Sequence, residues 1–403
     1  MIKEKKLKLH DNIQFIYELA LARLELDALG ANFEITNNLR EFKLNSTGNL
    51  ASLKRRLAYF KTVDAEFTDY YFIQAANQTR SVNQYLTHWF YPYKGKFHPQ
   101  MIRALLNIIG IKEGETVLDP FIGSGTTALE CQLLGINCIG IDISPLCVLI
   151  SKVKTESLDA LPKIEPTKND FMPAESLVFG LSDPQTSLFK ERKAKKVKDD
   201  KVKNFFRLAE MIAHSDSARR KKNFQTSFVF NVDRMIASLK DYKKIAAKLN
   251  LKLGETDIRE GDVRKLDLGK KVQGIITSPP YSIALNYVAN DAHALKAMGY
   301  DLDGIKDRFI GVRGTGMDKF KLYNEDMLLA YKKMFEVLEA GRYCVVVIGN
   351  VTFQNQEVDT TGEVVRQCEA VGFKLERKIE KIIFGLYNVM QKEYILIFKK
   401  PAK

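Results

Sequence analysis

The sequence lacks the features that mark membrane-spanning, secreted and zinc-binding proteins. No run reaches the roughly 18 apolar residues that a transmembrane helix needs. The opening residues, MIKEKKLKLHDN, have no apolar stretch of the kind found in a secretory signal. The 5 cysteines are an odd number, form no C-x-x-C pair and have no histidine at zinc spacing, which is typical of free thiols in a reducing compartment. We therefore expect a cytoplasmic protein that binds no metal and crosses no membrane.

Positive charge is what the chain has in excess. Lys and Arg number 62 against 49 Asp and Glu, so the formal net charge is +13. Such a charge attracts polyanions, and it favours nucleic acid or an anionic surface as a partner. The composition is otherwise that of an ordinary globular protein, with 45% hydrophobic and 28% charged residues. A length of 403 residues predicts two or three domains.

The first part of the chain, residues 1–87, reads as a helical region. Asp11 is positioned to cap a first helix. The apolar side of that helix would carry Ile13, Ile16, Ala20 and Leu24. A second amphipathic stretch runs from about residue 50 to residue 60.

Short apolar strands alternate with helices in the rest of the chain, apart from one interruption. The expected strands are 115–119, 137–142, 272–278 and 342–349, and the expected later helices are near 322–339 and 361–371. This alternation predicts a mostly parallel sheet that is covered on both faces. Two closing strands, 373–384 and 392–400, follow one another without a helix, which predicts one antiparallel edge.

The interruption is a basic segment, residues 151–256, which would be mainly helical. Within it, residues 190–203 hold eight basic and three acidic residues, and residues 230–251 resemble a long helix with a basic face. A charge run is usually a solvated face, but an insertion inside an α/β domain is also a natural place for a nucleic-acid-binding module. The insert would divide that domain into a cofactor-binding half, 88–150, and a catalytic half, 257–403.

The first chemical motif, DPFIGSGTTALE, follows the first strand of the sheet. Gly123, Gly125 and Ala128 fit G-x-G-x-x-A, a turn that brings a ligand against the N–H groups at a helix N-terminus. Asp119 places a carboxylate just before this turn, which suits an ammonium group better than a pyrophosphate. Asp142 ends the next strand, where a carboxylate accepts hydrogen bonds from ribose hydroxyls. These residues favour S-adenosylmethionine over a nicotinamide dinucleotide, and a plain strand–helix turn is the alternative.

The second motif, TSPPY (277–281), follows a strand that reads VQGII. Prolines have no N–H to donate, so their carbonyls remain free in a rigid loop at the sheet edge where α/β proteins place active sites. The Ser278 oxygen and the Pro279 carbonyl can accept both hydrogens of a planar amine, and Tyr281 offers a ring for stacking a base. An ordinary Pro-Pro turn is the alternative, but two such motifs in order on one sheet favour a function.

Together these motifs resemble those of the amino-group DNA methyltransferases, which modify cytosine N4 or adenine N6. FHPQMIRALL (97–106) is similar to that family's third cofactor element, and EGDVRKLD (260–267) to its acidic loop beside the cofactor's adenine. The resemblance covers roughly 88–150 and 258–400. It implies a class I methyltransferase-like α/β fold, with a mostly parallel seven-stranded sheet and one antiparallel strand. In this chain the insert separates Asp142 from Asp262, whereas the family's cofactor elements follow one another closely.

The resemblance also implies S-adenosylmethionine as cofactor, no metal, double-stranded DNA as partner, and a companion restriction endonuclease as a further candidate partner. The catalytic candidates are Ser278, Pro279, Pro280 and Tyr281. The cofactor-binding candidates are Phe97, His98, Pro99, Asp119, Pro120, Phe121, Gly123, Ser124, Gly125, Thr126, Thr127, Asp142 and Asp262. The candidates for phosphate contacts, chosen for their charge and position, are Lys94, Lys96, Lys195, Lys196, Arg219, Arg220, Arg308 and Arg313.

The residue at position 278 favours cytosine N4 in a flipped-out base as the target. Family members that methylate adenine mostly carry Asp or Asn there, and those that methylate cytosine N4 mostly carry Ser. A serine also has a proton that can pair with the ring nitrogen beside the cytosine amine. The alternatives are an N6-adenine enzyme, an RNA guanine-N2 enzyme and a catalytically silent DNA-binding protein. Methylation at cytosine C5 is excluded, because it needs a cysteine after a proline and no Pro-Cys occurs.

Overall fold

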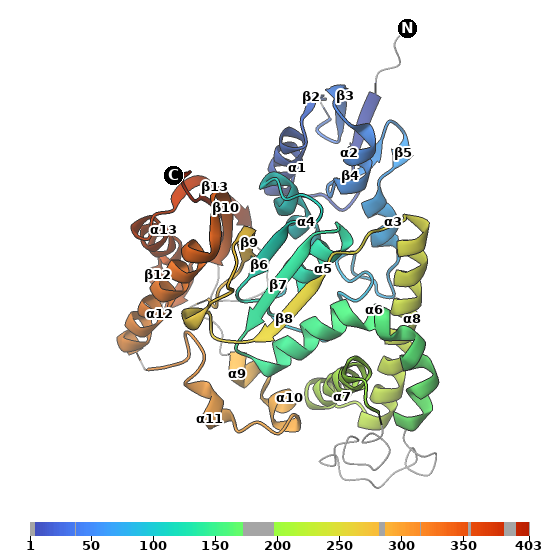
Figure 1. Cartoon of the computed structure of the whole chain (residues 1–403), viewed down its shortest axis with the longest axis vertical. Helices are drawn as coiled ribbons and strands as arrows, with labels where there is room; N and C mark the ends of the chain where they lie inside the picture. Colours follow the sequence, from blue (N-terminus) through green and yellow to red (C-terminus); the bar gives the residue numbers. More distant parts are fainter. Residues whose placement is uncertain are drawn as a thin grey trace.

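A computed structural model describes residues 5–36, 38–171, 197–281, 287–314, 316–353, 356–382 and 392–402. The described chain is built around a seven-stranded sheet, with a smaller five-stranded sheet near the N-terminus and a helical layer at the opposite end (Figure 1). A short hairpin is formed by β11 (Val351–Phe353) and β12 (Gln356–Val358). No helix in these described ranges is long and apolar enough to cross a membrane.

The seven-stranded sheet has the strand order β13-β14-β10-β9-β6-β7-β8. Its strands are β6 (Thr116–Asp119), β7 (Asn137–Asp142), β8 (Thr256–Glu260), β9 (Val272–Thr277), β10 (Leu338–Gly349), β13 (Lys374–Ile382) and β14 (Lys392–Lys399). The neighbours from β10 to β8 run parallel, and β14 is antiparallel to both β10 and β13. The prediction of a mostly parallel sheet with one antiparallel strand is confirmed.

The antiparallel strand does not lie at the edge, as the sequence had suggested, because β14 lies between β10 and β13. The composition of the two strands explains the difference. In β14 the run from Tyr394 to Phe398 is buried, whereas most of β13 (KLERKIEKI) is exposed or half-buried. A strand that is apolar on both faces suits the interior of a sheet, and a charged strand suits its edge.

Helices cover both faces of this sheet. On one face α4 (Pro99–Ile108) packs on alternate strand residues, including Val117 and Ile276. On the other face α12 (Gly316–Val337) and α13 (Thr360–Ala370) pack on the intervening residues, including Leu118 and Ile275. Alternation along each strand therefore fills two separate cores, as expected for a sheet buried on both sides. The helix α5 (Thr126–Leu133) connects β6 to β7.

The N-terminal region is not the purely helical unit that the sequence predicted, because it contains an antiparallel sheet of order β2-β3-β1-β4-β5. Its strands are β1 (Lys5–Leu9), β2 (Ala31–Ile35), β3 (Glu41–Thr47), β4 (Phe60–Val63) and β5 (Glu66–Phe67), and its helices are α1 (Ile16–Ala28), α2 (Leu50–Arg56) and α3 (Asp69–Ala75).

Two local patterns account for this error. In β1 the lysines are exposed and Leu7 and Leu9 are buried, a period of two that the run of charges obscures. The first helix begins at Ile16 and not at Asp11, and Ile16 is 82% exposed. Asp11 instead lies 2.6 Å from the Lys61 ammonium group.

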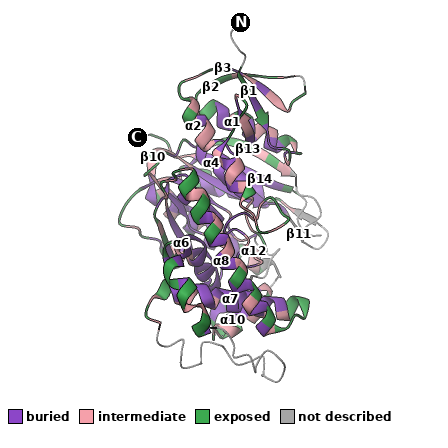
Figure 2. Cartoon of the chain, turned by 90° about the vertical axis from the view of Figure 1, so that its right-hand side faces the viewer, coloured by how far each residue is buried: buried purple, intermediate pink, exposed green. Residues whose placement is uncertain are grey.

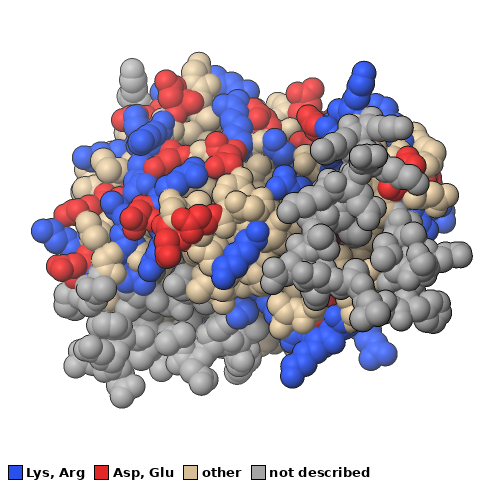
Figure 3. All heavy atoms as spheres, turned by 90° about the horizontal axis from the view of Figure 1, so that it is seen from below, with Lys and Arg blue, Asp and Glu red and all other residues tan. Residues whose placement is uncertain are grey.

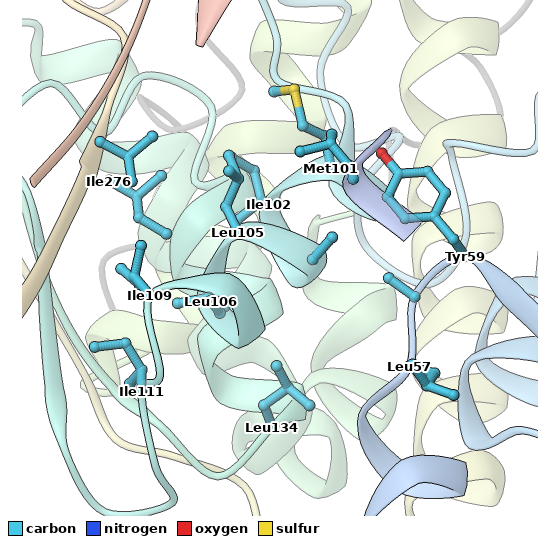
Figure 4. Packing of buried hydrophobic residues seen from close by; sticks show 14 of the residues in the cluster. Leu57, Tyr59, Met101, Ile102, Leu105, Leu106, Ile109, Ile111, Leu134 and Ile276 are labelled. Carbon is cyan, nitrogen blue, oxygen red and sulfur yellow. The ribbon is translucent and has the colours of Figure 1, made fainter. Parts of the chain in front are cut away.

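The helix α4 joins the N-terminal region to the central sheet. Figure 4 shows Met101, Ile102 and Leu105 of this helix between Leu57 and Tyr59 on one side and Ile276 on the other. The contact also includes a buried carboxylate, because Glu25 accepts a hydrogen bond from the Asn107 side chain of α4 at 3.1 Å as well as from Ala58 N and Tyr59 N. The N-terminal region and the central sheet therefore share one continuous core.

The insert is mainly helical, as predicted. Its described helices are α6 (Pro145–Phe171) from residue 151 onward, α7 (Asp200–Arg220) and α8 (Phe224–Lys248). Figure 2 shows both buried and exposed residues on these helices, and the buried residues form a core that includes Phe205, Phe206 and Val232. The remaining short elements are the 3-10 helix η4 (Val263–Lys265), α9 (Tyr287–Asn290), α10 (Ala292–Ala297) and α11 (Leu302–Lys306).

Candidate active site

A pocket lies at the carboxyl ends of the central parallel strands. This is the edge at which open α/β sheets bind their ligands. Its walls include residues 120–124 and 126 after β6, 142–144 after β7, 261–263 after β8, and 278 and 280 after β9. Residues 93, 95–97, 147, 291, 295 and 308–310 complete it.

The glycine turn after β6 has the geometry that its sequence predicts. Gly123 and Gly125 have positive φ angles of 50° and 75°, and Gly125 is the N-cap of α5. A Cβ on Gly125 would lie 2.9 Å from the Cα of Ser151 in α6, so a side chain has no room there. The turn therefore brings backbone N–H groups and the start of α5 to the pocket, and the adjacent Thr126 Oγ1 is buried without a hydrogen-bond partner in the described chain.

The buried side chain of Lys154 supports this turn from behind. Its ammonium nitrogen lies 2.7 Å from the carbonyl oxygen of Ser124. Burial lowers the pKa of Lys154 well below its ordinary value. No pattern in the sequence marks this residue, because its contact with the turn spans a helix and a strand.

Asp142 and Asp262 meet in the pocket although the insert separates them along the chain. Asp142 is paired in register with Glu260 between β7 and β8, and Gly261 N donates to the Asp142 backbone oxygen at 3.0 Å. The insert leaves the sheet after β7 and returns to it at the neighbouring strand. The order of the cofactor elements in space is therefore undisturbed.

The Asp142 carboxylate accepts hydrogen bonds from Gly123 N and Ser144 N, both at 2.9 Å. Burial raises the pKa of Asp142 to about 6, and these two hydrogen bonds oppose the rise. The Asp262 carboxylate is held by the Arg264 guanidinium, at 2.7 Å for the shortest contact. Burial acts to raise the pKa of Asp262, but the hydrogen bonds and ion pair with Arg264 outweigh it and lower this pKa.

Asp119, in contrast, lies behind the pocket wall and not in it. It is 1% exposed, and its carboxylate accepts hydrogen bonds from the hydroxyls of Thr277, at 2.6 Å, and Thr127, at 2.7 Å. Burial raises the pKa of Asp119 to about 6. The residue therefore ties the end of β6 to the end of β9 and to α5, a role different from the predicted contact with an ammonium group.

Only part of the TSPPY loop lines the pocket. Ser278 and Pro280 line it, and the Pro280 carbonyl accepts a hydrogen bond from Tyr323 at 2.9 Å. Tyr281 is 6% exposed, and its hydroxyl donates to Glu393 at 2.5 Å. In this structure the Tyr281 ring is packed in the core beneath α12 and is not presented as a stacking surface.

The FHP segment has one residue in the pocket wall and two at the start of a helix behind it. Phe97 lines the pocket, whereas His98 is the N-cap of α4 and Pro99 is its first residue. Burial lowers the pKa of His98 to about 3, so its ring is neutral.

One carboxylate in the pocket wall was not predicted. Asp291 lines the pocket with a side chain that is 9% exposed, and its Oδ1 accepts from the Tyr91 hydroxyl at 3.0 Å and from Arg219 at 3.3 Å. It follows the TSPPY motif in a segment without recognisable spacing, so no pattern in the sequence marks it.

The described basic candidates for phosphate contacts all have partners within the protein. The Lys96 ammonium group donates to Gln84 and to the His88 carbonyl, and burial lowers its pKa to about 7. Arg219 donates to Pro92 O at 3.1 Å and to Asn290 O at 2.7 Å. The other partners are Asn290 for Lys94, Asp216 for Arg220, Glu260 for Arg308 and Asp326 for Arg313.

These contacts change the expected role of the basic residues. Lys96 and Arg219 serve the packing around the pocket, whereas Lys195 and Lys196 lie outside the described residues. On the face seen in Figure 3, Lys and Arg side chains are interspersed with Asp and Glu. Intramolecular pairing of this kind leaves the surface of the described insert less uniformly positive than its sequence suggests.

The sheet order and the pocket define a class I methyltransferase-like domain. Residues 31–153 of the chain match the DNA methylase family of N6 and N4 methyltransferases. This match supports the amino-methyltransferase family that the resemblance predicted, although it ends before TSPPY.

Individual relatives match over shorter parts of their lengths. The Type II methyltransferase M.MjaII of Methanocaldococcus jannaschii is 49% identical over 72 residues, which is 18% of this chain and 13% of that protein. The Type II methyltransferase M.BsoBI of Geobacillus stearothermophilus is 34% identical over 151 residues, 34% of this chain and 30% of that protein. A tRNA (guanine(10)-N2)-dimethyltransferase of Methanothermobacter thermautotrophicus is 40% identical over 55 residues, 14% of this chain and 16% of that protein. The chain thus spans less than a third of the length of each of these relatives.

Proposed function

We propose that this protein transfers a methyl group from S-adenosylmethionine to an exocyclic amino group of a base in DNA. The observation that carries the proposal is a single pocket whose wall contains both the glycine turn with Asp142 and the serine of TSPPY. The first group of residues suits a nucleoside cofactor, and the second suits a planar amine. The family of residues 31–153 and the Type II methyltransferases among the relatives support DNA as the polymer.

The residues of the pocket fit S-adenosylmethionine. Asp142 would accept hydrogen bonds from the ribose hydroxyls and Asp262 would face the adenine. The N-terminus of α5 and the unpartnered hydroxyl of Thr126 would hold polar groups of the methionine part, and Asp291 in place of Asp119 would face the ammonium group. When bound, the cofactor supplies an electrophilic methyl group on a sulfonium sulfur.

The protein's own contribution to the reaction would be to orient the amine. The lone pair of an exocyclic amine is delocalised into the ring, so the amine is a poor nucleophile. Ser278 Oγ and the Pro279 carbonyl would accept its two hydrogens and favour a pyramidal nitrogen with an available lone pair. Because the amine is buried in a duplex, the base must first leave the stack, at a cost of a few kcal/mol.

The test is transfer of label from tritiated S-adenosylmethionine to duplex DNA and, separately, to tRNA. We expect labelled DNA, and the Ser278→Ala variant should lose transfer with little loss of cofactor binding because its bond matters most as the amine changes shape. Label in tRNA alone would contradict DNA as substrate and would favour the function named for the guanine-N2 relative. No label in either polymer would contradict methyl transfer to nucleic acid and favour a silent binding protein.

The target that we propose is cytosine N4, because family members that methylate cytosine N4 mostly carry Ser at position 278. Mass spectrometry of nucleosides from the labelled DNA should give N4-methylcytosine. N6-methyladenine alone would contradict this assignment and leave the enzyme class intact. A cytoplasmic location and a companion restriction endonuclease remain predictions of the sequence.

A further inference from the structure

A chain of hydrogen bonds leads from the pocket wall into the closing strands of the sheet. Ser278 Oγ lies 3.2 Å from the Tyr281 hydroxyl, and this hydroxyl lies 2.5 Å from Oε1 of Glu393. The other oxygen of Glu393 is paired with the Lys381 ammonium group. Lys381 and Glu393 are partners in register between β13 and β14, so the sheet fixes the end of this hydrogen-bond chain that lies away from the pocket.

The direction of these hydrogen bonds follows from counting protons. An ionised carboxylate can only accept, so the single hydroxyl proton of Tyr281 is donated to Glu393. Tyr281 can then meet Ser278 only as an acceptor, and the Ser278 proton is donated to Tyr281. The Ser278 oxygen is left with lone pairs and with no proton of its own to offer to the pocket.

Glu393 is a buried carboxylate with a partner on each oxygen. Its side chain is 8% exposed, and that of Lys381 is 17% exposed. A buried carboxylate is tolerated where it is paired and hydrogen-bonded, and Lys381 and Tyr281 supply both conditions. A hydrogen bond that ends on a charged group is also stronger than a neutral one, and neighbouring bonds in such a chain polarise one another.

We propose that Glu393, acting through Tyr281, is a positioning residue that makes Ser278 an acceptor-only group. The inference rests on the proposed function, in which Ser278 accepts a hydrogen from the amine of the target base. A neutral hydroxyl would then do the work that a carboxylate or amide oxygen does at this position in other family members. It follows that Ser278 does not use its proton to recognise the ring nitrogen of cytosine.

The experiment compares Tyr281→Phe, Glu393→Gln and the double variant. Each is measured by the single-turnover rate of methyl transfer to the nucleic acid that accepts label and by calorimetric binding of S-adenosylmethionine. Each single variant should lower the rate about 10- to 100-fold, the scale of one lost charge-assisted hydrogen bond. The rate of the double variant should be no lower than that of the slower single variant, because both changes break the same hydrogen-bond chain. Cofactor affinity should stay close to that of the wild type.

A matched control separates this role from general damage to the loop. Tyr323→Phe removes a different tyrosine hydroxyl that holds the same loop, at the Pro280 carbonyl. When Tyr323→Phe is combined with Glu393→Gln, the two fold-reductions in rate should multiply, because Tyr323 lies outside the Ser278–Tyr281–Glu393 hydrogen bonds. In a Ser278→Ala background, Tyr281→Phe and Glu393→Gln should lower the residual rate no further.

The possible failures can be told apart. An active wild type whose rate is unaffected by Glu393→Gln would overturn the inference alone. The same holds if the effects of Tyr281→Phe and Glu393→Gln multiply, or if they persist without Ser278. A wild type that transfers label to neither DNA nor tRNA would overturn the proposed function and this inference with it.

Discussion

At the scale of single residues, two aspartates that end neighbouring strands have different roles because their surroundings differ. Asp142 lines the pocket and is held by two backbone N–H groups. Asp119 is enclosed by the hydroxyls of Thr127 and Thr277. Burial raises the pKa of each carboxyl to about 6, so both titrate in an accessible range of pH.

We predict that cofactor binding weakens as the pH falls through the pKa of Asp142. The carboxylate is the charged form above a pH of about 6, and the neutral acid below it is a weaker acceptor for ribose hydroxyls. The dissociation constant of S-adenosylmethionine should therefore rise as the pH falls from 7 to 5, by about tenfold per unit below the pKa. Asp142→Asn should bind about 10- to 100-fold more weakly at pH 7 and lose this pH dependence. Calorimetry at several pH values measures both effects.

Asp119→Asn is the control for this prediction. The new amide would still accept a hydrogen bond but would provide no carboxylate for Thr127 and Thr277, so the free energy of unfolding should fall by about 1–3 kcal/mol. The pH dependence of cofactor binding should persist in this variant. Its loss in Asp119→Asn, or its persistence in Asp142→Asn, would contradict the assignment of the two aspartates.

At the scale of elements, the packing of α5 against α6 depends on a residue without a side chain. A Cβ at Gly125 would lie 2.8 Å from the Ser151 hydroxyl oxygen and 2.9 Å from the Ser151 Cα. Because these near atoms include backbone, the two helices would have to separate, and Thr126 and Ser124 would move with them. The shape of the pocket is thus coupled to the distance between two helices.

We predict that Gly125→Ala lowers the free energy of unfolding by about 2–4 kcal/mol, from the positive φ and the overpacking together. Gly269→Ala is a matched control, since Gly269 also has a positive φ, 63°, but nothing lies within 4 Å of its added Cβ. The control should cost only about 1 kcal/mol. Denaturant unfolding of the two variants makes the comparison, and equal losses would show that the contact with Ser151 does not matter.

The elements also show where sequence reasoning succeeds. The inner strands β6 and β7 contain apolar runs, VLD and IGID, that end in a turn residue, so their pattern survives without knowledge of the neighbours. The edge strand β8 (TDIRE) has no such run and was not predicted. The lysines of β1 concealed an alternating strand, and the N-terminal sheet was missed for that reason. Glu393 and Asp291 were missed because their partners, Tyr281 and Tyr91, are distant in the chain and are brought close only by sheet pairing and helix packing. Asp119 was placed correctly at the end of a strand, but burial cannot be read from position alone.

At the scale of the whole molecule, some basic residues stabilise the fold through partners within the protein, and only the others are available to bind a polyanion. Arg219 links α7 to the backbone of residues 92 and 290 and to Asp291 in the pocket wall, so it joins the insert to the catalytic half. A net charge of +13 still favours a polyanion. The residues that meet phosphates should therefore be sought among basic side chains other than this one.

We predict that replacing Lys195 and Lys196 by Gln reduces the slope of log affinity for DNA against log salt by about two units, one for each lost phosphate contact. Arg219→Gln should leave this slope nearly unchanged and should lower the melting temperature, because its partners lie within the protein. Fluorescence anisotropy with labelled duplex DNA between about 50 and 200 mM salt measures the slopes. A steep loss of slope in Arg219→Gln, with none in the lysine variant, would reverse the assignment.

The interior position of β14 has a consequence for the order in which the sheet can be completed during synthesis. Because synthesis starts at the N-terminus, all six remaining strands of the central sheet are made before Lys392–Lys399 emerges. Until then β10 and β13 each have an edge that awaits β14, and unpaired strand edges are sites at which chains associate with one another. Nascent or truncated chains that stop before β14 should therefore be prone to aggregate and to depend on chaperones. The last strand of this sheet to leave the ribosome is therefore the one that pairs with the open edges of β10 and β13.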